Sequence, residues 1–129
     1  MLNKVVFDSS AFIALLAKEK SYSFLRSHLK NAIISAVSLA DVYKYCIEEQ
    51  NLTKDDCLKL TELSGLKVIE FCNEQALISA YIISQTKPYG LSLGDRACLA
   101  LALYKKSPIV TCDKIWERVK LNVEIFIAS

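Results

Sequence analysis

The stretch VVFDSSAF, residues 5–12, runs from a short β-branched segment into a carboxylate, two hydroxyls and further apolar chain. Three consecutive apolar residues are typical of a strand buried on both faces, and the segment that follows, at 11–20, has the composition of a helix. Asp8 therefore lies at the junction between a predicted strand and a predicted helix. An aspartate at this position could simply cap the helix, so the rest of the sequence must decide whether Asp8 acts alone.

Four further short apolar runs have the composition of buried strands. They are AIISA at 32–36, KVIEF at 67–71, PIVTC at 108–112 and NVEIFI at 122–127. Helical segments separate the strands, at 11–20, 21–30, 38–50, 53–65, 73–87, 92–106 and 113–119. Strands that alternate with helices predict an α/β fold with a central parallel sheet of about five strands and helices on both faces. With 129 residues, 53% of them hydrophobic, the chain has the size of a single domain spanning 1–129.

The composition excludes several classes of protein. The net charge is +2 and no dense Lys/Arg tract occurs, so charge alone does not indicate nucleic-acid binding. The longest apolar run, at 97–104, is far shorter than the ~20 residues of a membrane span, and Asp8 interrupts any signal-peptide core. His28 is the only histidine, which disfavours a Ser/His/Asp or Cys/His triad. Five cysteines without a C-x-x-C pair are typical of reduced core residues, and we expect a cytoplasmic protein.

Four aspartates stand where such a fold gathers functional groups. Asp8 ends the first predicted strand, and Asp113 directly follows the fourth. Asp41 and Asp95 fall in the opening turns of predicted helices. In open α/β sheets ligands bind beyond the carboxyl ends of the strands, so all four acids would lie at one edge. Two carboxylates ~5 Å apart repel by about 3 kcal/mol at an effective dielectric of about 20, and a divalent cation is the obvious counter-charge.

Helix capping is the competing interpretation of the same acids. Three Ser/Thr-x-x-Asp patterns match a capping box, at 38–41, 53–56 and 92–95, and Asp8 and Asp113 could each be an N-cap. The pattern at 53–56 lies in a charged stretch, and helix capping alone accounts for it. The other two patterns lie in apolar surroundings. From the residues alone, a metal cluster and a set of unrelated caps remain equally open.

Polar and basic neighbours of the acids are candidates for supporting roles. Ser9 and Thr111 flank two of the acids and would orient a carboxylate or a water molecule. Arg96 and Lys114 would contact phosphate. The ordinary alternatives are a hydroxyl at a strand end and a solvated surface cation, and for Ser10 the ordinary alternative is preferred.

Four fragments occur in order along the chain and cover it nearly end to end: VVFDSSAFIALL, ISAVSLADVYKY, GLSLGDRACLALAL and PIVTCDKIW. Together they resemble the signature blocks of the PIN-domain ribonucleases, especially the VapC-type toxins of prokaryotic toxin–antitoxin pairs. Position by position, Asp8 matches the first acid of the family, Asp95 the third, and Asp113 the fourth, with Thr111 as its partner hydroxyl. Asp41 falls where the family usually has Glu, so its side chain is one methylene shorter.

The resemblance implies a doubly wound α/β fold and a Mg²⁺- or Mn²⁺-dependent endoribonuclease that hydrolyses RNA phosphodiester bonds as the toxin of a type II toxin–antitoxin system. Asp8, Asp95 and Asp113 would bind the metal, since hard cations prefer oxygen ligands. Asp41 would complete the catalytic set by positioning or deprotonating the attacking water, or by helping to bind a second ion. The expected partners are an RNA such as tRNA or rRNA, a small cognate antitoxin protein and a second copy of the chain in a homodimer, with no membrane association.

Rival functions agree less well with the sequence. A response-regulator receiver needs a pair of acids after the first strand and an acceptor Asp after the third, but VVFDSS has one acid and VIEFCN has no Asp. A phosphatase of the D-x-D type needs an acid at position 10, which is Ser10. The remaining alternative is a catalytically weak or inactive PIN-like binding module that acts through a protein partner, and Asp41 in place of Glu is the one sequence feature in its favour.

Overall fold

The five predicted strands form one sheet. The structure, a computed structural model, describes residues 3–128. The strands are β1 (Val5–Phe7), β2 (Ala32–Ser35), β3 (Lys67–Ile69), β4 (Ile109–Thr111) and β5 (Ile125–Ile127). They pair in parallel in the order β3-β2-β1-β4-β5, and Val6 of the central strand lies opposite both Ile33 and Ile109. The predicted parallel sheet is confirmed, although β3 and β5 are shorter than the apolar runs at 67–71 and 122–127.

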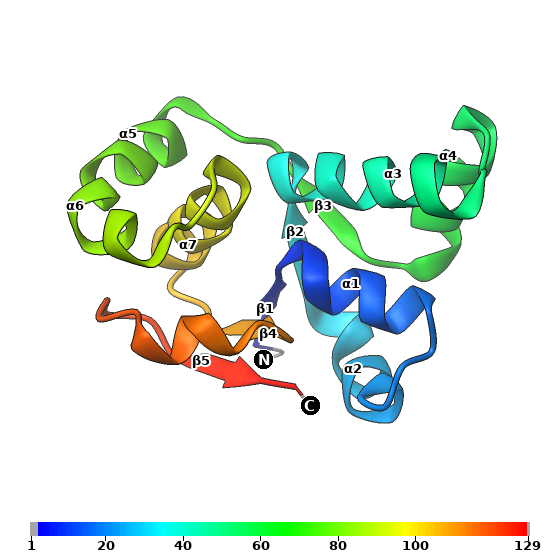
Figure 1. Cartoon of the computed structure of the whole chain (residues 1–129), viewed down its shortest axis with the longest axis horizontal. Helices are drawn as coiled ribbons and strands as arrows, with labels where there is room; N and C mark the ends of the chain where they lie inside the picture. The colour runs from blue at the N-terminus through cyan, green and yellow to red at the C-terminus, as the bar shows by residue number, and fades with distance from the viewer. Residues whose placement is uncertain (1–2, 129) are drawn as a thin grey trace.

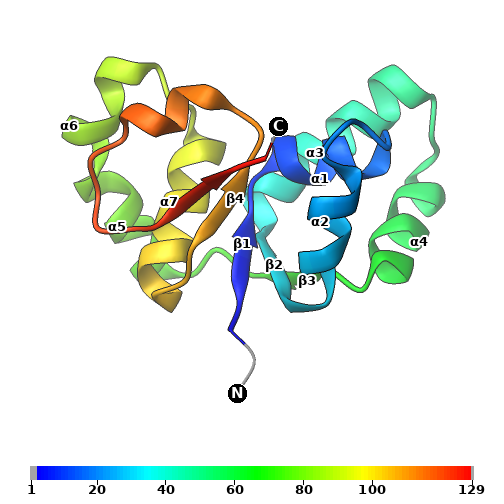
Figure 2. The same cartoon turned by 90° about the horizontal axis from the view of Figure 1, so that it is seen from below.

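Helices connect the strands. Along residues 3–128 the α-helices are α1 (Ser9–Leu16), α2 (Tyr22–His28), α3 (Ala36–Gln50), α4 (Lys54–Ser64), α5 (Asn73–Tyr81), α6 (Ile83–Thr86) and α7 (Leu93–Lys105). Short 3-10 turns add η1 (Leu29–Asn31), η2 (Lys87–Tyr89) and η3 (Lys114–Arg118). Helices α1 to α4 lie on one side of the sheet and α5 to α7 on the other (Figures 1 and 2), which confirms the prediction that helices cover both faces.

The alternation of side chains along β1 explains these two layers. Successive residues of a strand point to opposite faces of the sheet. Val5 and Phe7 accordingly belong to the core beneath α1 to α4, whereas Val6 belongs to the core beneath α7. Trp116 of η3 is 1% exposed and closes this second core. Because β1 is apolar on both faces, it takes the middle of the sheet, and the residue that follows it lies at the centre of the carboxyl-terminal edge.

Helix α1 begins and ends earlier than the predicted 11–20, at Ser9 and Leu16. Two further helical segments also differ from the sequence prediction, and hydrogen bonds accompany both. Helix α3 begins two residues before 38–50, because Ser35 is its N-cap and its hydroxyl oxygen accepts a hydrogen bond from the Val37 N–H at 3.2 Å. The segment at 73–87 is not one helix but α5, α6 and the start of η2. In α6 the Thr86 hydroxyl donates to the Ile82 carbonyl oxygen at 2.9 Å, and such bonds from a side chain back to the previous turn tend to bend helices.

The remaining sequence features also have clear places in the fold. The five cysteines are free thiols, and Cys46, Cys57 and Cys98 are buried. The apolar stretch at 97–104 is core over 97–102. In the part of the chain that the structure describes, no helix is long and apolar enough to cross a membrane.

Candidate active site

Asp8 lies at the centre of the edge formed by the carboxyl ends of the strands. It follows β1 directly, caps α1, and is only 3% exposed. Its Oδ1 accepts hydrogen bonds from the Ser10 hydroxyl at 2.7 Å and from the Ala11 N–H at 2.8 Å. Its Oδ2 accepts from the hydroxyl of Thr111, the last residue of the neighbouring strand β4. The pairing of β1 with β4 therefore brings together a carboxylate and a hydroxyl that are about a hundred residues apart in the sequence.

The pKa of Asp8 is raised from its ordinary 3.8 to about 6. Burial is the largest cause, and the negative charge of Asp95 raises the pKa further, whereas the hydrogen bonds from Thr111, Ser10 and Ala11 lower it. Among the described residues, no cationic side chain contributes to the shift. At neutral pH Asp8 is therefore a buried anion that lacks a counter-charge from the chain around it.

Asp95 lies in the first turn of α7, near enough to Asp8 for its charge to raise the pKa of Asp8. As predicted, it forms a capping box with Ser92: the Ser92 N–H donates to Asp95 Oδ2 at 3.1 Å, and the Asp95 N–H donates to Ser92 Oγ at 3.2 Å. Cys98 is fully buried one turn further along α7, and burial raises the pKa of its thiol, with Asp8 and Asp95 adding to the effect. Asp8 and Asp95 are therefore near enough for their charges to act on each other and on Cys98.

Asp41 reaches the same region from a different position than the sequence indicated. The prediction that Asp41 lies in an opening turn and forms a capping box with Ser38 is wrong, because α3 begins at Ala36 and Asp41 is in its second turn. The Ser38 hydroxyl instead donates to the Gly94 carbonyl oxygen at 3.3 Å. The Oδ2 of Asp41 lies 2.5 Å from the place where a Cβ on Gly94 would be. Helix α3 therefore carries Asp41 to the first turn of α7.

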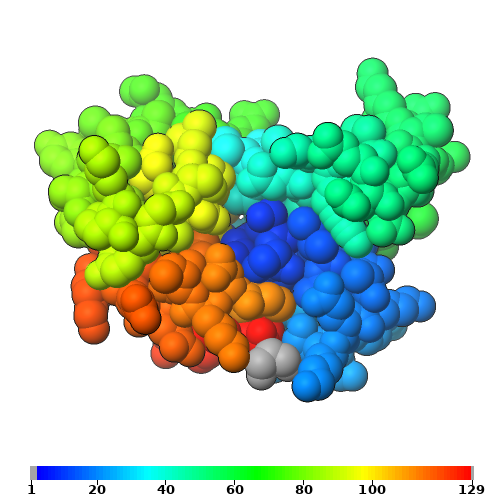
Figure 3. Space-filling view, viewed as in Figure 1, coloured from blue at the N-terminus to red at the C-terminus, as the bar shows by residue number. Residues whose placement is uncertain are grey.

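Asp113 is the most peripheral of the four acids. It is exposed and caps η3, where its Oδ1 accepts a hydrogen bond from the Ile115 N–H at 3.1 Å. The Asp113 N–H donates to Thr111 Oγ1 at 3.1 Å, and Thr111 in turn donates to Asp8. Thr111 thus connects the two acids. Figure 3 shows the start of α1 in dark blue, where the surfaces of α3 in cyan, α7 in yellow and η3 in orange meet.

Helix capping and a shared acidic site, the two interpretations drawn from the sequence, are compatible in this geometry. Asp8, Asp95 and Asp113 each cap a helix or turn, and the same caps fix the backbone from which their carboxylates project. Helix capping therefore does not argue against a shared site at this edge.

The supporting residues divide into those at the edge and those away from it. Ser10, rather than Ser9, donates to Asp8, and its hydroxyl oxygen also accepts the Cys112 N–H at 3.0 Å. The sequence signal for this role was the position of Ser10 two residues after Asp8, but an ordinary strand-end hydroxyl was preferred there. Ser9 is half-buried and Lys114 is exposed. Arg96 donates to the Leu91 carbonyl oxygen at 3.2 Å and lines a small cavity between α5, α6 and α7, so it is turned toward α5.

Residues 5–122 match the PIN domain in a comparison with protein families. The chain belongs to the PIN domain family. PIN domains are nucleases, and they generally use divalent metal ions. No curated protein matches the sequence of this PIN domain.

Solved structures of toxin–antitoxin proteins share the fold. The DNA-bound VapBC of Salmonella typhimurium is 17% identical with a TM-score of 0.74, over 97% of this chain and 98% of that one. FitAcB of Neisseria gonorrhoeae is 20% identical with a TM-score of 0.69, over 95% and 96%. The sarcin-ricin loop cleaving toxin VapC20 of Mycobacterium tuberculosis is 11% identical with a TM-score of 0.71, over 94% and 99%. This PIN domain therefore has the VapC-like fold.

The four acids of this PIN domain are the right kind of ligand for a divalent metal ion, but they do not form a metal-binding cluster. Asp8 is a buried anion whose pKa is raised further by the charge of Asp95, and all four candidates offer only oxygen ligands, which suits Mg²⁺ or Mn²⁺. Among residues 3–128, however, no three His, Cys, Asp or Glu side chains are close enough together to hold a metal ion as they stand. A cation such as Mg²⁺, which keeps several of its waters, would be held by one or two of these carboxylates together with water.

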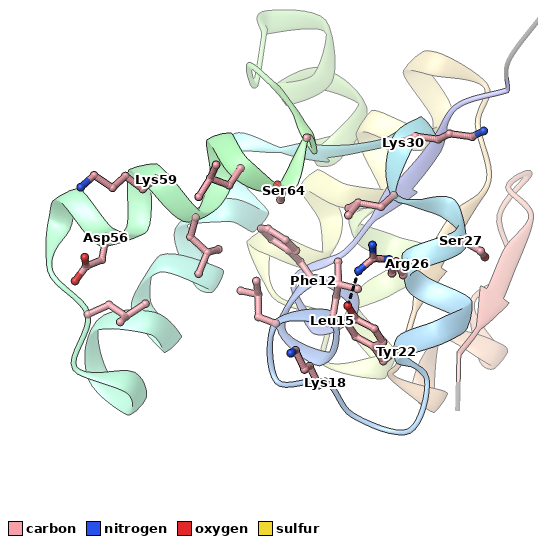
Figure 4. Close-up of a pocket in the computed structure, with 16 residues that line it drawn as sticks. Phe12, Leu15, Lys18, Tyr22, Arg26, Ser27, Lys30, Asp56, Lys59 and Ser64 are labelled. Atoms are coloured by element: carbon pink, nitrogen blue, oxygen red, sulfur yellow. Dashed lines mark hydrogen bonds between the residues drawn. The ribbon is translucent and has the colours of Figure 1, made fainter.

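A second feature of this PIN domain, a groove of about 1080 Å³, was not indicated by the sequence. It lies between α1, α2 and α4 (Figure 4), with an apolar lining that includes Phe12, Leu15, Leu60 and Leu63. Four cations and one acid line it: Lys18, Arg26, Lys30, Lys59 and Asp56. Phe12, which lines the groove, lies four residues after Asp8, so the groove and Asp8 both adjoin α1.

Proposed function

We propose that this protein is a Mg²⁺- or Mn²⁺-dependent endoribonuclease and the toxin of a type II toxin–antitoxin pair that acts in the cytoplasm. The observation that carries the proposal is the environment of Asp8. A fold that needed Asp8 only as a helix cap would not bury an anion beside a second carboxylate, because burial and repulsion both oppose folding. A buried acid with a strongly raised pKa is typical of a functional site.

In this proposal the four aspartates have different roles. Asp8, Asp95 and Asp113 hold the cation, which when bound supplies the Lewis acidity that polarises a phosphate ester. Ser10 and Thr111 hold the carboxylate of Asp8 through both of its oxygens. This arrangement favours a fixed ligand at the bottom of the site.

The remaining residues act on the attacking water and on the RNA. Asp41, exposed on α3, orients the attacking water and accepts its proton. Hydrolysis by water leaves a 5′-phosphate and a 3′-hydroxyl on the RNA. Lys114, exposed next to Asp113, is available to contact a flanking phosphate, and Ser9 lies between Asp8 and Ser10 at the floor of the edge.

The experiment that tests this function is cleavage of structured RNA, such as tRNA and rRNA, with and without the metal. We expect cleavage in millimolar Mg²⁺ or Mn²⁺, its loss in EDTA, and its loss in Asp8→Asn, which should still fold. The alternative, an inactive PIN-like module that only binds a protein partner, predicts no cleavage in either metal. Cleavage by Asp8→Asn at the rate of the unsubstituted protein would show that the catalytic assignment is wrong.

We also propose that the groove between α1, α2 and α4 binds the cognate antitoxin. Its apolar lining would accept one face of an amphipathic helix, and its excess of cations favours an acidic segment. Several neighbours of the same fold are complexes of a toxin with its antitoxin, which supports this choice of partner. A segment that continued from the groove along α1 toward its first turn would cover the acidic edge.

Two leucines of α4 give a matched test of this docking. Leu63 lines the groove and is 85% exposed, whereas Leu58 is 52% exposed on the same helix and does not line the groove. Leu63→Asp should prevent co-purification with the cognate antitoxin, and Leu58→Asp should not. Equal retention of the partner by both variants would contradict the assignment.

We propose in addition that the protein is a homodimer. Helices α5 and α6 expose Leu77, Tyr81 and Ile83, an apolar surface on the side of the sheet opposite the groove. Exposed apolar patches of this kind mark interaction surfaces. Light scattering should give twice the mass of the chain for the unsubstituted protein and the mass of one chain for Tyr81→Glu, whereas a monomeric unsubstituted protein would contradict the proposal.

A further inference from the structure

The backbone conformation at position 94 does not require a glycine. Gly94 lies inside the first turn of α7, between Leu93 and Asp95, and unlike Gly65 and Gly90 it does not have a positive φ. Glycine inside a helix is less favourable than alanine, because it loses more conformational freedom on folding. A reason other than backbone conformation must therefore account for it.

The reason lies in the space that Gly94 leaves open. A Cβ at this position would be 2.5 Å from Asp41 Oδ2 and 3.6 Å from Asp41 Cγ, and the first of these distances is too short for any real contact. The Ser38 hydroxyl donates to the Gly94 carbonyl oxygen, so α3 and α7 approach closely at this point. The carboxylate of Asp41 thus occupies the volume that a side chain at position 94 would take.

We infer that Gly94 is a positioning residue that brings Asp41 into the acidic site, an inference that rests on the function proposed above. Asp95 is the residue after Gly94 in the same turn of α7, so the contact with Gly94 places Asp41 next to the position of Asp95. The contact also explains how the shorter acid serves at position 41. With Asp41 Oδ2 only 2.5 Å from the Cβ position of residue 94, the shorter acid already reaches the first turn of α7.

Gly94→Ala separates this role from a role in folding. The added methyl group meets the end of a side chain that can rotate, so the fold should remain and α7 should gain helix propensity. Because Asp41 would hold a water bound to the cation rather than the cation itself, displacing its carboxylate should still weaken Mn²⁺ binding, measured by calorimetry on the metal-free protein, by about tenfold or more. Mn²⁺ binding to Gly94→Ala with the affinity of the unsubstituted protein would overturn the inference.

The double variant with Asp41→Ala controls for indirect effects. Asp41→Ala removes the group that Gly94→Ala displaces, so adding Gly94→Ala to it should change the Mn²⁺ affinity less than about twofold. If Gly94→Ala lowers the melting temperature, Asp41→Ala should restore it, and failure to restore it would also overturn the inference. The outcomes differ from failure of the proposed function, in which the unsubstituted protein itself binds no Mn²⁺.

Discussion

Replacement of Asp8 by Asn should stabilise the metal-free protein at neutral pH. The pKa of Asp8 is about 6 in the folded protein and 3.8 ordinarily, so the folded state binds the proton more tightly than the unfolded state. Stability contributed by the protonated form is therefore complete below pH ~4 and is lost as the pH rises to about 6. At 1.36 kcal/mol for each pKa unit, keeping Asp8 ionised costs the fold about 3 kcal/mol above this range.

The net gain in Asp8→Asn is smaller than this cost. The side-chain oxygen of the introduced amide can still accept from Ser10 and Ala11, but its NH₂ group must now donate to Thr111, whose hydroxyl has to turn, at a cost of about 1 kcal/mol. About 2 kcal/mol remains. For 129 residues with an unfolding entropy of about 2.1 cal/mol/K each, this raises the melting temperature by about 7 °C.

The assay is thermal unfolding of both proteins in EDTA between pH 4 and pH 8. We expect the two melting temperatures to converge near pH 4 and to separate as the pH rises through 6, with Asp8→Asn the more stable. A variant that is less stable than the unsubstituted protein at pH 7.5, or a difference that does not change with pH, would refute the assigned environment of Asp8.

Three further substitutions test the surroundings of the site. Ser10→Ala should raise the pKa of Asp8 further and cost about 1–3 kcal/mol in urea unfolding, because the Cys112 N–H loses its acceptor. Asp56→Asn should leave RNA cleavage unchanged and lower the melting temperature at pH 7. Since hydrogen bonds with Thr53 lower the pKa of Asp56, this difference should vanish in acid, and a loss of cleavage would contradict its role as a cap only. Trp116→Ala should cost about 3–5 kcal/mol, because the indole fills the core under η3, and a smaller loss in urea unfolding would contradict that packing.

The sequence predicts the parts of the site that depend on local patterns. Asp8 and Asp113 could be placed because each follows an apolar run whose end marks the end of a strand. Asp95 could be placed because a serine three residues earlier fixes the start of α7. Parallel pairing then brings the ends of β1 and β4 together, and Thr111 reaches Asp8 as a direct consequence.

The parts that depend on tertiary contacts were not predictable from these patterns. Ser35 and Ser38 are both acceptable caps for α3, and spacing alone favoured the wrong one, which misplaced Asp41 by one turn. The role of Ser10 depends on the N–H of Cys112, the residue that follows β4. The close approach of Asp41 to Gly94 depends on how α3 and α7 meet, for which the sequence carries no periodic signal.

Direct titration of Mn²⁺ into the metal-free protein is the measurement that bears most closely on the shared acidic site. At pH 7.5 we predict saturable binding that Asp8→Asn and Asp95→Asn each abolish, because each removes a ligand from the same cation. Absence of binding, or binding that persists unchanged in both variants, would contradict the account.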